Sequence, residues 1–351
     1  MGRDSKEVTV GSMEYAKVHP LKKAMRSKAF PLLVLFVLMI IFFSTFPQVY
    51  VGPHARFLQM RTFWRILEAL SVPGLLTIGA GLLIVSGGID LSTGAVGGFA
   101  GVMLATGVAW HGWPAWMVII IALVGSAIIG LINAVIINEL KLPAFIVTMA
   151  MASVVPGIGL LLSRNPAGTF LGTVPFRYSL LETIGRHRLF GEVNTAALVV
   201  IALFIIYGVV LSKTQFGRTL YLMGGNRQAA RLVGINEKKI SYFLFINCSV
   251  LAGLAGLLNA MRVGMGGANV LIGDQFTGIT AAILGGISFG GGSGGLGGAF
   301  MGLVVIRTFS QGTAVSGASA YLTAPASGAL LILALTFDYF NQRRQLKRLG
   351  V

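Results

Sequence analysis

Charged residues are scarce in this chain. They make up 11% of its 351 residues, whereas hydrophobic residues make up 55%, and the mean hydropathy is +0.82. A soluble domain carries about 25% charged residues, and no segment of normal domain size lies between the long apolar runs of this chain. The composition therefore excludes an ordinary soluble protein and predicts an all-α, polytopic integral membrane protein.

Several kinds of chemistry are missing as well. The single cysteine, Cys248, excludes an intrachain disulfide. The four histidines are scattered and show neither the spacing of a metal site nor that of a nucleophile–base pair. The Gly-Lys-Ser/Thr end of a phosphate-binding loop does not occur. The sequence therefore predicts no enzymatic activity, no metal site and no cofactor in this chain.

About ten apolar runs approach the length of about 20 residues that a spanning helix needs. They are Ala29–Phe46, Ile66–Ser86, Ser92–Ala109, Pro114–Ile137, Pro143–Leu162, Thr195–Leu211, Ile240–Met261, Phe276–Phe289, Gly295–Thr313 and Tyr321–Phe337. The run Phe276–Phe289 is short and broken by glycine, so it is expected to be a half-helix or a surface turn. The predicted organisation is a transmembrane domain at 29–338 between basic tails at 1–28 and 339–351.

The net charge of +16 collects at the ends of the apolar runs, which is typical of a membrane protein and not of nucleic-acid binding. With the N-terminus inside, eighteen lysines and arginines fall on the cytoplasmic side and seven on the other side. This imbalance predicts that both termini are cytoplasmic. The outer segment Ser163–Asn194 has enough apolar and aromatic residues for a short surface helix.

The basic stretch Thr214–Glu237 lies between two of these apolar runs. Its middle, Asn226–Val233, predicts a short helix, because an N-cap residue comes first and two alanines follow. Gly234 stands where a helix stops in the left-handed conformation. Such a helix at a membrane surface is suited to dock into a groove on another protein. An ordinary basic loop that only fixes orientation has the same charge pattern.

This stretch resembles the cytoplasmic coupling loop of ABC-transporter permeases for simple sugars, the branch typified by ribose, galactose and xylose importers. The residues of the candidate coupling loop, within 213–239, are Phe216, Gly217, Arg218, Gly224, Gly225, Asn226, Ala229, Ala230 and Gly234. The resemblance covers most of the chain from about Ile66 to Phe337. It implies that the loop inserts into a separate ABC ATPase subunit, on which ATP and Mg²⁺ act.

The resemblance also implies an assembly in a bacterial inner membrane. A second permease subunit, identical or paralogous, completes the path, and an extracytoplasmic binding protein delivers the solute. That solute is a simple sugar or a related polyol or nucleoside. From the residues alone, two other functions stay open. An ion-coupled secondary transporter needs acids or histidines within its spans, and this chain has few; a non-transporting scaffold would use the abundant glycine for packing.

Asp90 and Ser92 stand in the motif Gly87–Ser92, which interrupts an apolar run. An acid at membrane depth is costly and usually functional, so the motif predicts a broken helix that lines the substrate path. The alternative is a tight cytoplasmic turn in which Asp90 caps the next helix. The motif resembles the family signature GIDLSVG, with Thr93 in place of the valine.

Other polar residues in the apolar runs are further candidates for the substrate path. They are Asn133, Thr148, Asp274, Gln275, Thr277 and Ser288. The structural alternatives are a helix–helix hydrogen bond for Asn133 and a hydrogen bond from Thr148 to its own helix. Sugar permeases of the family carry a glutamate and an aspartate where Gln275 and Thr277 stand, with Asp274 one position earlier. This departure puts the usual sugar in doubt.

The glycine-rich run from Gly285 continues with Gly294, Gly298 and Gly302 at a spacing of four, which predicts close helix packing. Arg307 follows within an apolar run. It is expected to be structural, although a guanidinium that faces a cavity can bind an anionic or hydroxylated ligand.

Overall fold

The computed structural model describes residues 30–50, 57–189 and 192–317, together with the single positions 325, 328, 329, 332 and 336. The predicted tails at 1–28 and 339–351 lie outside the described residues, as does nearly all of the predicted span Tyr321–Phe337. Within the described part the fold is all-α, with thirteen helices and four strands of two or three residues.

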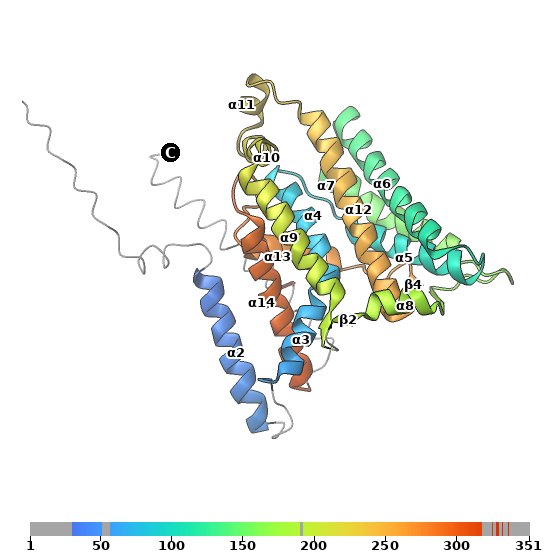
Figure 1. The fold of residues 1–351 in the computed structure, drawn as a ribbon. Coiled ribbons are helices and arrows are strands. Elements are labelled where there is room, and N and C mark those ends of the chain that lie inside the picture. The colour runs from blue at the N-terminus through green and yellow to red at the C-terminus, as the bar shows by residue number, and fades with distance from the viewer. Residues whose placement is uncertain are drawn as a thin grey trace, which may run out of the picture.

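The helices come in a single bundle (Figure 1). They are α2 (Phe30–Tyr50), α3 (Met60–Ala69), α4 (Ser71–Val85), α5 (Thr93–Ala109), α6 (Ala115–Glu139), α7 (Ala144–Leu162), α8 (Ser179–Arg186), α9 (Thr195–Lys213), α10 (Gln215–Gly225), α11 (Arg227–Leu232), α12 (Glu237–Val263), α13 (Asp274–Leu284) and α14 (Leu296–Val315). The strands are β1 (Thr173–Pro175), β2 (Arg188–Leu189), β3 (Val193–Asn194) and β4 (Met265–Gly267).

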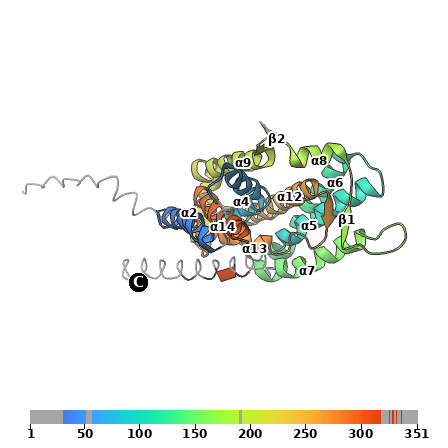
Figure 2. The same cartoon turned by 90° about the horizontal axis from the view of Figure 1, so that it is seen from below.

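The centre of the bundle is occupied by α4, α5 and α12 (Figure 2). Every residue of α4 is buried, and α12 packs against α4, α5 and α6. Small residues allow this packing: a Cβ at Gly256 of α12 would lie 1.8 Å from the carbonyl oxygen of Gly97 in α5. The two backbones therefore touch, as small-residue contacts between helices in lipid require.

Long apolar helices surround this centre. Ile120, Val124 and Ile128 of α6 are about half exposed, as expected of a face that meets lipid. Among the described residues, four helices are long and apolar enough to cross a membrane, or up to five if α3 and α4, bent by 45°, form one span. The predicted number of about ten spans is therefore not confirmed. Glycine breaks are one reason, because they leave α13 with only 11 residues, as the half-helix alternative predicted.

The two ends of the bundle carry different structures (Figure 1). One end, called here the α11 end, carries α10, α11 and the start of α12. The other, the α8 end, carries α3, α8 and the hairpin of β2 with β3. The short helix predicted within Ser163–Asn194 is present as α8. Nearby, β1 pairs with β4 in antiparallel register, with Thr173 opposite Gly267.

Candidate functional site

The predicted short helix in the basic stretch is present as α11. The Oδ1 of Asn226 accepts a hydrogen bond of 3.0 Å from the backbone N–H of Ala229, which is the expected N-cap. Gly234 adopts a φ of +81°, and its N–H donates to the Arg231 carbonyl at 3.0 Å. The cap and the stop are thus where the local sequence predicts them.

The two glycines before α11 have the pattern of a turn in the sequence, and this prediction is wrong. Gly224 and Gly225 do not form a turn; they are the last two residues of α10. The N-cap of α10 is Thr214, whose side-chain oxygen accepts from the N–H of Gly217 at 3.3 Å, and the helix buries Leu220 completely. An N-cap and a buried apolar face outweigh the low helix propensity of glycine at the end of the segment.

The surface of this segment is more apolar than its charge suggests. Leu232 is 88% exposed and Val233 is 69% exposed, and we call these two residues the apolar tip. Ala230 is fully buried, whereas Ala229 is exposed. The residues predicted for the coupling loop include both alanines but not the apolar tip. Two bulky apolar residues inside a basic loop were the signal that could have found it.

Behind α11, three backbone segments meet without side chains between them. The N–H of Gly292, between α13 and α14, donates to the carbonyl of Val85 at the end of α4, at 2.9 Å. A Cβ at Gly224 would lie 1.9 Å from that same carbonyl oxygen and 2.5 Å from the Gly292 nitrogen. A Cβ at Gly291 would lie 3.0 Å from the Gly224 oxygen and 3.1 Å from the Gly87 nitrogen. We call this contact the glycine junction: Val85, Gly87, Gly224, Gly291 and Gly292.

Two side chains from the α10–α11 segment reinforce the glycine junction. The hydroxyl of Tyr221 donates to the Gly294 carbonyl at 2.7 Å, and Nη2 of Arg227 lies 3.4 Å from the Gly87 carbonyl. The segment is therefore bonded both to the end of α4 and to the α13–α14 connection.

The two connections at the junction begin in the same way. Gly87 and Gly286 have φ values of +80° and +89°. The N–H of the following residue donates to the carbonyl five positions earlier: Gly88 to Leu83, and Ile287 to Ala282. In the sequence, Gly87–Ile89 resembles Gly285–Ile287, which would align Gly87 with Gly285. The structures of the two segments are also similar, but there Gly87 corresponds to Gly286. Both helices end in a left-handed glycine stop.

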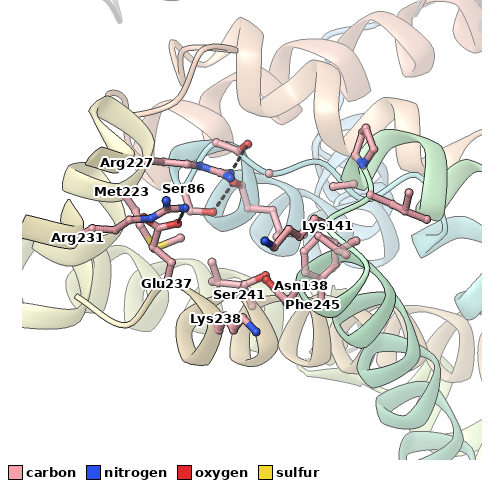
Figure 3. Close-up of a pocket in the computed structure, with 18 residues that line it drawn as sticks. Ser86, Asn138, Lys141, Met223, Arg227, Arg231, Glu237, Lys238, Ser241 and Phe245 are labelled. Atoms are coloured by element: carbon pink, nitrogen blue, oxygen red, sulfur yellow. Dashed lines mark hydrogen bonds and ion pairs between the residues drawn. The ribbon is translucent and has the colours of Figure 1, made fainter. Parts of the chain in front are cut away.

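A cavity of about 480 Å³ opens beside the glycine junction at the α11 end (Figure 3). Its walls come from the end of α4, the α6–α7 turn, the α10–α11 segment and the start of α12. Arg231 makes two bonds to Glu237, of 2.8 and 3.1 Å, and this hydrogen bonding raises the pKa of the Arg231 guanidinium. Lys238 reaches Glu139 of α6 at 2.7 Å. These pairs join α11 and α6 to α12.

Asp90, Ser92 and Asn133 form one buried polar cluster. Oδ1 of Asp90 accepts from the N–H and the hydroxyl of Ser92, at 2.8 and 2.6 Å, and Nδ2 of Asn133 lies 3.0 Å from the Ser92 hydroxyl oxygen. The exposed fractions are 3%, 0% and 0%. Within the described residues, Oδ2 of Asp90 and Oδ1 of Asn133 have no hydrogen-bond partner. The cluster ties the α4–α5 connection to α6, because Asn133 of α6 bonds to Ser92 just before α5.

The α4–α5 connection runs from the α11 end back into the bundle (Figure 1). It begins at Gly87 in the glycine junction. A few residues on, a Cβ at Gly94 would lie 2.2 Å from Oε1 of Gln275 in the first turn of α13. The connection therefore lies against the start of α13. It brings Gln275 to the same region as the cluster of Asp90, Ser92 and Asn133.

Asp274 begins α13 and pairs with Arg307 of α14, with Nη2 and Oδ1 3.4 Å apart. At a rise of 1.5 Å per residue, each of the two residues lies about 16 Å along its helix from the α11 end. This distance is about half the thickness of a hydrocarbon core of about 30 Å. The structural role expected for Arg307 is thus present as an ion pair at membrane depth.

The remaining candidates are also buried. Thr148 donates to the Ala144 carbonyl of its own helix at 2.8 Å, the alternative given for it above. Thr277 is 8% exposed, and Ser288 is 6% exposed, with its N–H bonded to the Ser293 carbonyl. In the glycine run, a Cβ at Gly298 would lie 2.0 Å from the Gly285 oxygen, which is the predicted close packing.

One prediction follows from the polar cluster. Replacing Ser92 by alanine removes the hydroxyl that donates to Asp90 and accepts from Asn133, while the backbone N–H still donates to Asp90. We expect this loss to cost about 1–3 kcal/mol of stability, as loss of a buried hydrogen-bond partner does. The thermal unfolding midpoint of the purified protein measures this. Thr148→Val is the matched control, because its hydroxyl bonds only to its own helix. Equal midpoints for the two variants would contradict the bridging role of Ser92.

Comparison with known proteins supplies the class to which this architecture belongs. The family model described as the permease component of the branched-chain amino acid transport system matches residues 63–335. The fructose import permease FrcC of Rhizobium meliloti is 30% identical over 317 residues, which cover 90% of this chain and 86% of that protein. No solved structure matches the chain.

Two further relatives transport pentoses, according to their names. The ribose import permease RbsC of Bacillus subtilis is 30% identical over 88% of this chain and 91% of its own length. The xylose transport permease XylH of Haemophilus influenzae is 27% identical over 92% of this chain and 99% of its own length. The chain therefore belongs to the ABC-importer permease family that includes the ribose, fructose and xylose import permeases.

Proposed function

We propose that this membrane permease subunit forms the path of an ATP-driven importer for a simple sugar or a related polyol or nucleoside. In this proposal the α11 end and both termini face the cytoplasm of a bacterium, and the inner membrane surrounds the bundle. A separate ABC ATPase subunit holds ATP and Mg²⁺ and receives α11. A second permease subunit completes the path, and an extracytoplasmic solute-binding protein docks at the α8 end.

The observation that carries the coupling proposal is the combination of an exposed apolar tip with the glycine junction behind it. Leu232 and Val233 expose bulky apolar side chains beyond the end of the apolar helix α9. A groove on another protein is a suitable partner for this apolar surface. A displacement of α11 is transmitted to α10 through a single residue, Asn226, which separates the two helices.

From α10, the displacement is transmitted through backbone contacts. Gly224 touches Val85 and Gly292 without flexible side chains between them, so α10 cannot move toward α4 without displacing the ends of α4 and of the α13–α14 connection. Closely packed interiors transmit such strain.

For the solute, we propose the region where the α4–α5 connection meets the start of α13. Asp90, Ser92, Asn133 and Gln275 supply carboxylate, hydroxyl and amide groups there, and these are the groups that bind sugar hydroxyls through hydrogen bonds. Thr148 is a weaker candidate, because its hydroxyl bonds to its own helix, and Thr277 and Ser288 stay candidates for the path.

Leu232→Asp tests the coupling proposal. We expect this variant to reach the membrane in normal amounts and to lose about tenfold or more of its ATP-dependent uptake, because a charge replaces an apolar anchor of the kind that dominates interface energetics. Uptake is measured in proteoliposomes that contain the ATPase and the binding protein. Leu140→Asp is the control: this exposed residue lies in the α6–α7 turn at the same end of the bundle, so it adds the same charge outside α11.

A cross-linking experiment locates the contact independently. A cysteine in place of Asn226 should form a disulfide or a short cross-link with the ATPase subunit in the assembled transporter. Full uptake by Leu232→Asp, or labelling of the cysteine at position 226 only from the extracytoplasmic side, would contradict the proposal.

A further inference from the structure

The cavity at the α11 end carries more positive charge than nearby carboxylates balance. The cationic residues that line it are Lys141, Arg227, Arg231 and Lys238. Arg231 is paired with Glu237 and Lys238 with Glu139. Within the described residues, Lys141 and Arg227 form no ion pair with a carboxylate. Two positive charges at this cavity are therefore uncompensated.

These two cations come from different walls of the cavity. Lys141 belongs to the turn between α6 and α7, Arg227 begins α11, and Figure 3 shows both side chains reaching into the space between the walls. The guanidinium of Arg227 bonds to the Gly87 carbonyl at 3.4 Å. Like charges that approach without an anion repel each other, so an anionic group between them would be stabilised.

The backbone at Lys141 is unusual. Its φ of +55° makes it the one residue other than glycine with a positive φ in the described part of the chain. A residue with a Cβ adopts this conformation at a cost, and such conformations persist where the surrounding structure imposes them, often at binding sites. Here the conformation belongs to a tight turn that carries the lysine on the cavity wall.

Neutral groups complete a site that suits a small ligand. Nδ2 of Asn138 donates to the Ser241 hydroxyl oxygen at 3.0 Å, which leaves the hydroxyl hydrogen of Ser241 free to donate to a ligand. Leu142, Leu244 and Phe245 add apolar surface. The volume of about 480 Å³ is that of a cavity for a small molecule.

We propose that this cavity binds a phosphate group, held by Lys141 and Arg227 with the Ser241 hydroxyl as a neutral donor. Two sources share this chemistry: a small phosphate ester, and the headgroup of an anionic phospholipid. The orientation rests on the proposed function, since the cavity then opens to the cytoplasm, where a kinase that consumes the imported solute would make such an ester. A bound phosphate would connect the α6–α7 turn to α11 and restrain the coupling segment.

Binding to the purified full-length chain, without an ATPase, tests the proposal. In detergent, inorganic phosphate and glycerol 3-phosphate are titrated while the thermal unfolding midpoint is recorded; in nanodiscs, phosphatidylglycerol is compared with phosphatidylcholine. Lys141→Asn should weaken binding of the effective probe by about tenfold, as expected for one lost charge-assisted hydrogen bond. Asparagine tolerates the left-handed backbone, so this variant keeps the turn. Lys239→Gln, on α12 outside the cavity lining, is the control.

The pattern of responses separates the two sources. A midpoint raised by the soluble probes identifies a small ester, and one raised only by phosphatidylglycerol identifies a lipid headgroup. No response to any probe, or equal losses in Lys141→Asn and Lys239→Gln, would overturn the proposal. Because no ATPase is present, this outcome is independent of the uptake measured for Leu232→Asp.

Discussion

Gly224→Ala is expected to reduce ATP-dependent uptake by about tenfold, since overpacking at a close contact costs about 1–3 kcal/mol. The added methyl would lie 1.9 Å from the Val85 carbonyl oxygen and 2.5 Å from the Gly292 nitrogen. Both are backbone atoms, so no side-chain rotation relieves the clash. Either α10 shifts away or the hydrogen bond between Gly292 and Val85 breaks, and α11 loses its rigid connection to α4.

The measurement is uptake in proteoliposomes together with the rate of ATP hydrolysis. A coupling defect appears as hydrolysis that continues while uptake falls. Gly225→Ala should have a smaller effect, because its Cβ would lie 3.9 Å from the Gly292 Cα, which is ordinary contact. Gly297→Ala, with no atom within 4 Å of its Cβ, is the unperturbed control on α14. Normal coupled uptake by Gly224→Ala would show that the junction does not transmit motion.

The second large effect is expected at Arg307. Arg307→Met leaves the Asp274 carboxylate at membrane depth without its cation, and we expect stability to fall by about 3 kcal/mol, the lower end for breaking a buried pair. We use the lower end of that range because the side chains of Arg307 and Asp274 are 20% and 31% exposed. The thermal unfolding midpoint in lipid nanodiscs measures the loss.

A second substitution distinguishes an unpaired charge from lost packing. Asp274→Asn combined with Arg307→Met removes both charges, and it should recover most of the stability that the single change loses. Arg188→Met serves as the control, because its pair with Glu68 at the α8 end is half exposed on the arginine side and is expected to contribute little. If the double variant is no more stable than Arg307→Met, the ion pair is not the reason for the loss.

Local features were predictable because they depend on neighbours in the chain. The apolar runs indicated a membrane protein, and the cap at Asn226 with the stop at Gly234 defined α11 within one residue. The bond of Thr148 to its own helix is of the same kind. Each depends on atoms no more than a few residues apart, so the residue types alone decide the outcome.

Errors arose where burial decides. Gly224 and Gly225 have the pattern of a turn, yet α10 continues through them because its other face is packed. Ala230 was a candidate for the docking surface and is buried, while the exposed apolar tip was overlooked. The described residues also do not confirm ten full spans, because hydrophobicity measures the affinity of a segment for lipid and does not show where glycine breaks divide it.

The sequence by itself determined that this chain is a helical membrane protein with a short capped helix in a basic loop, because composition and short-range hydrogen bonding suffice for both. Only the tertiary structure decided that Gly224 meets Val85 and Gly292, that Gln275 reaches Gly94 close to Ser92, and that Lys141 and Arg227 share one cavity. Those contacts join residues far apart in the chain, and the packing of whole helices against one another fixes which of them meet.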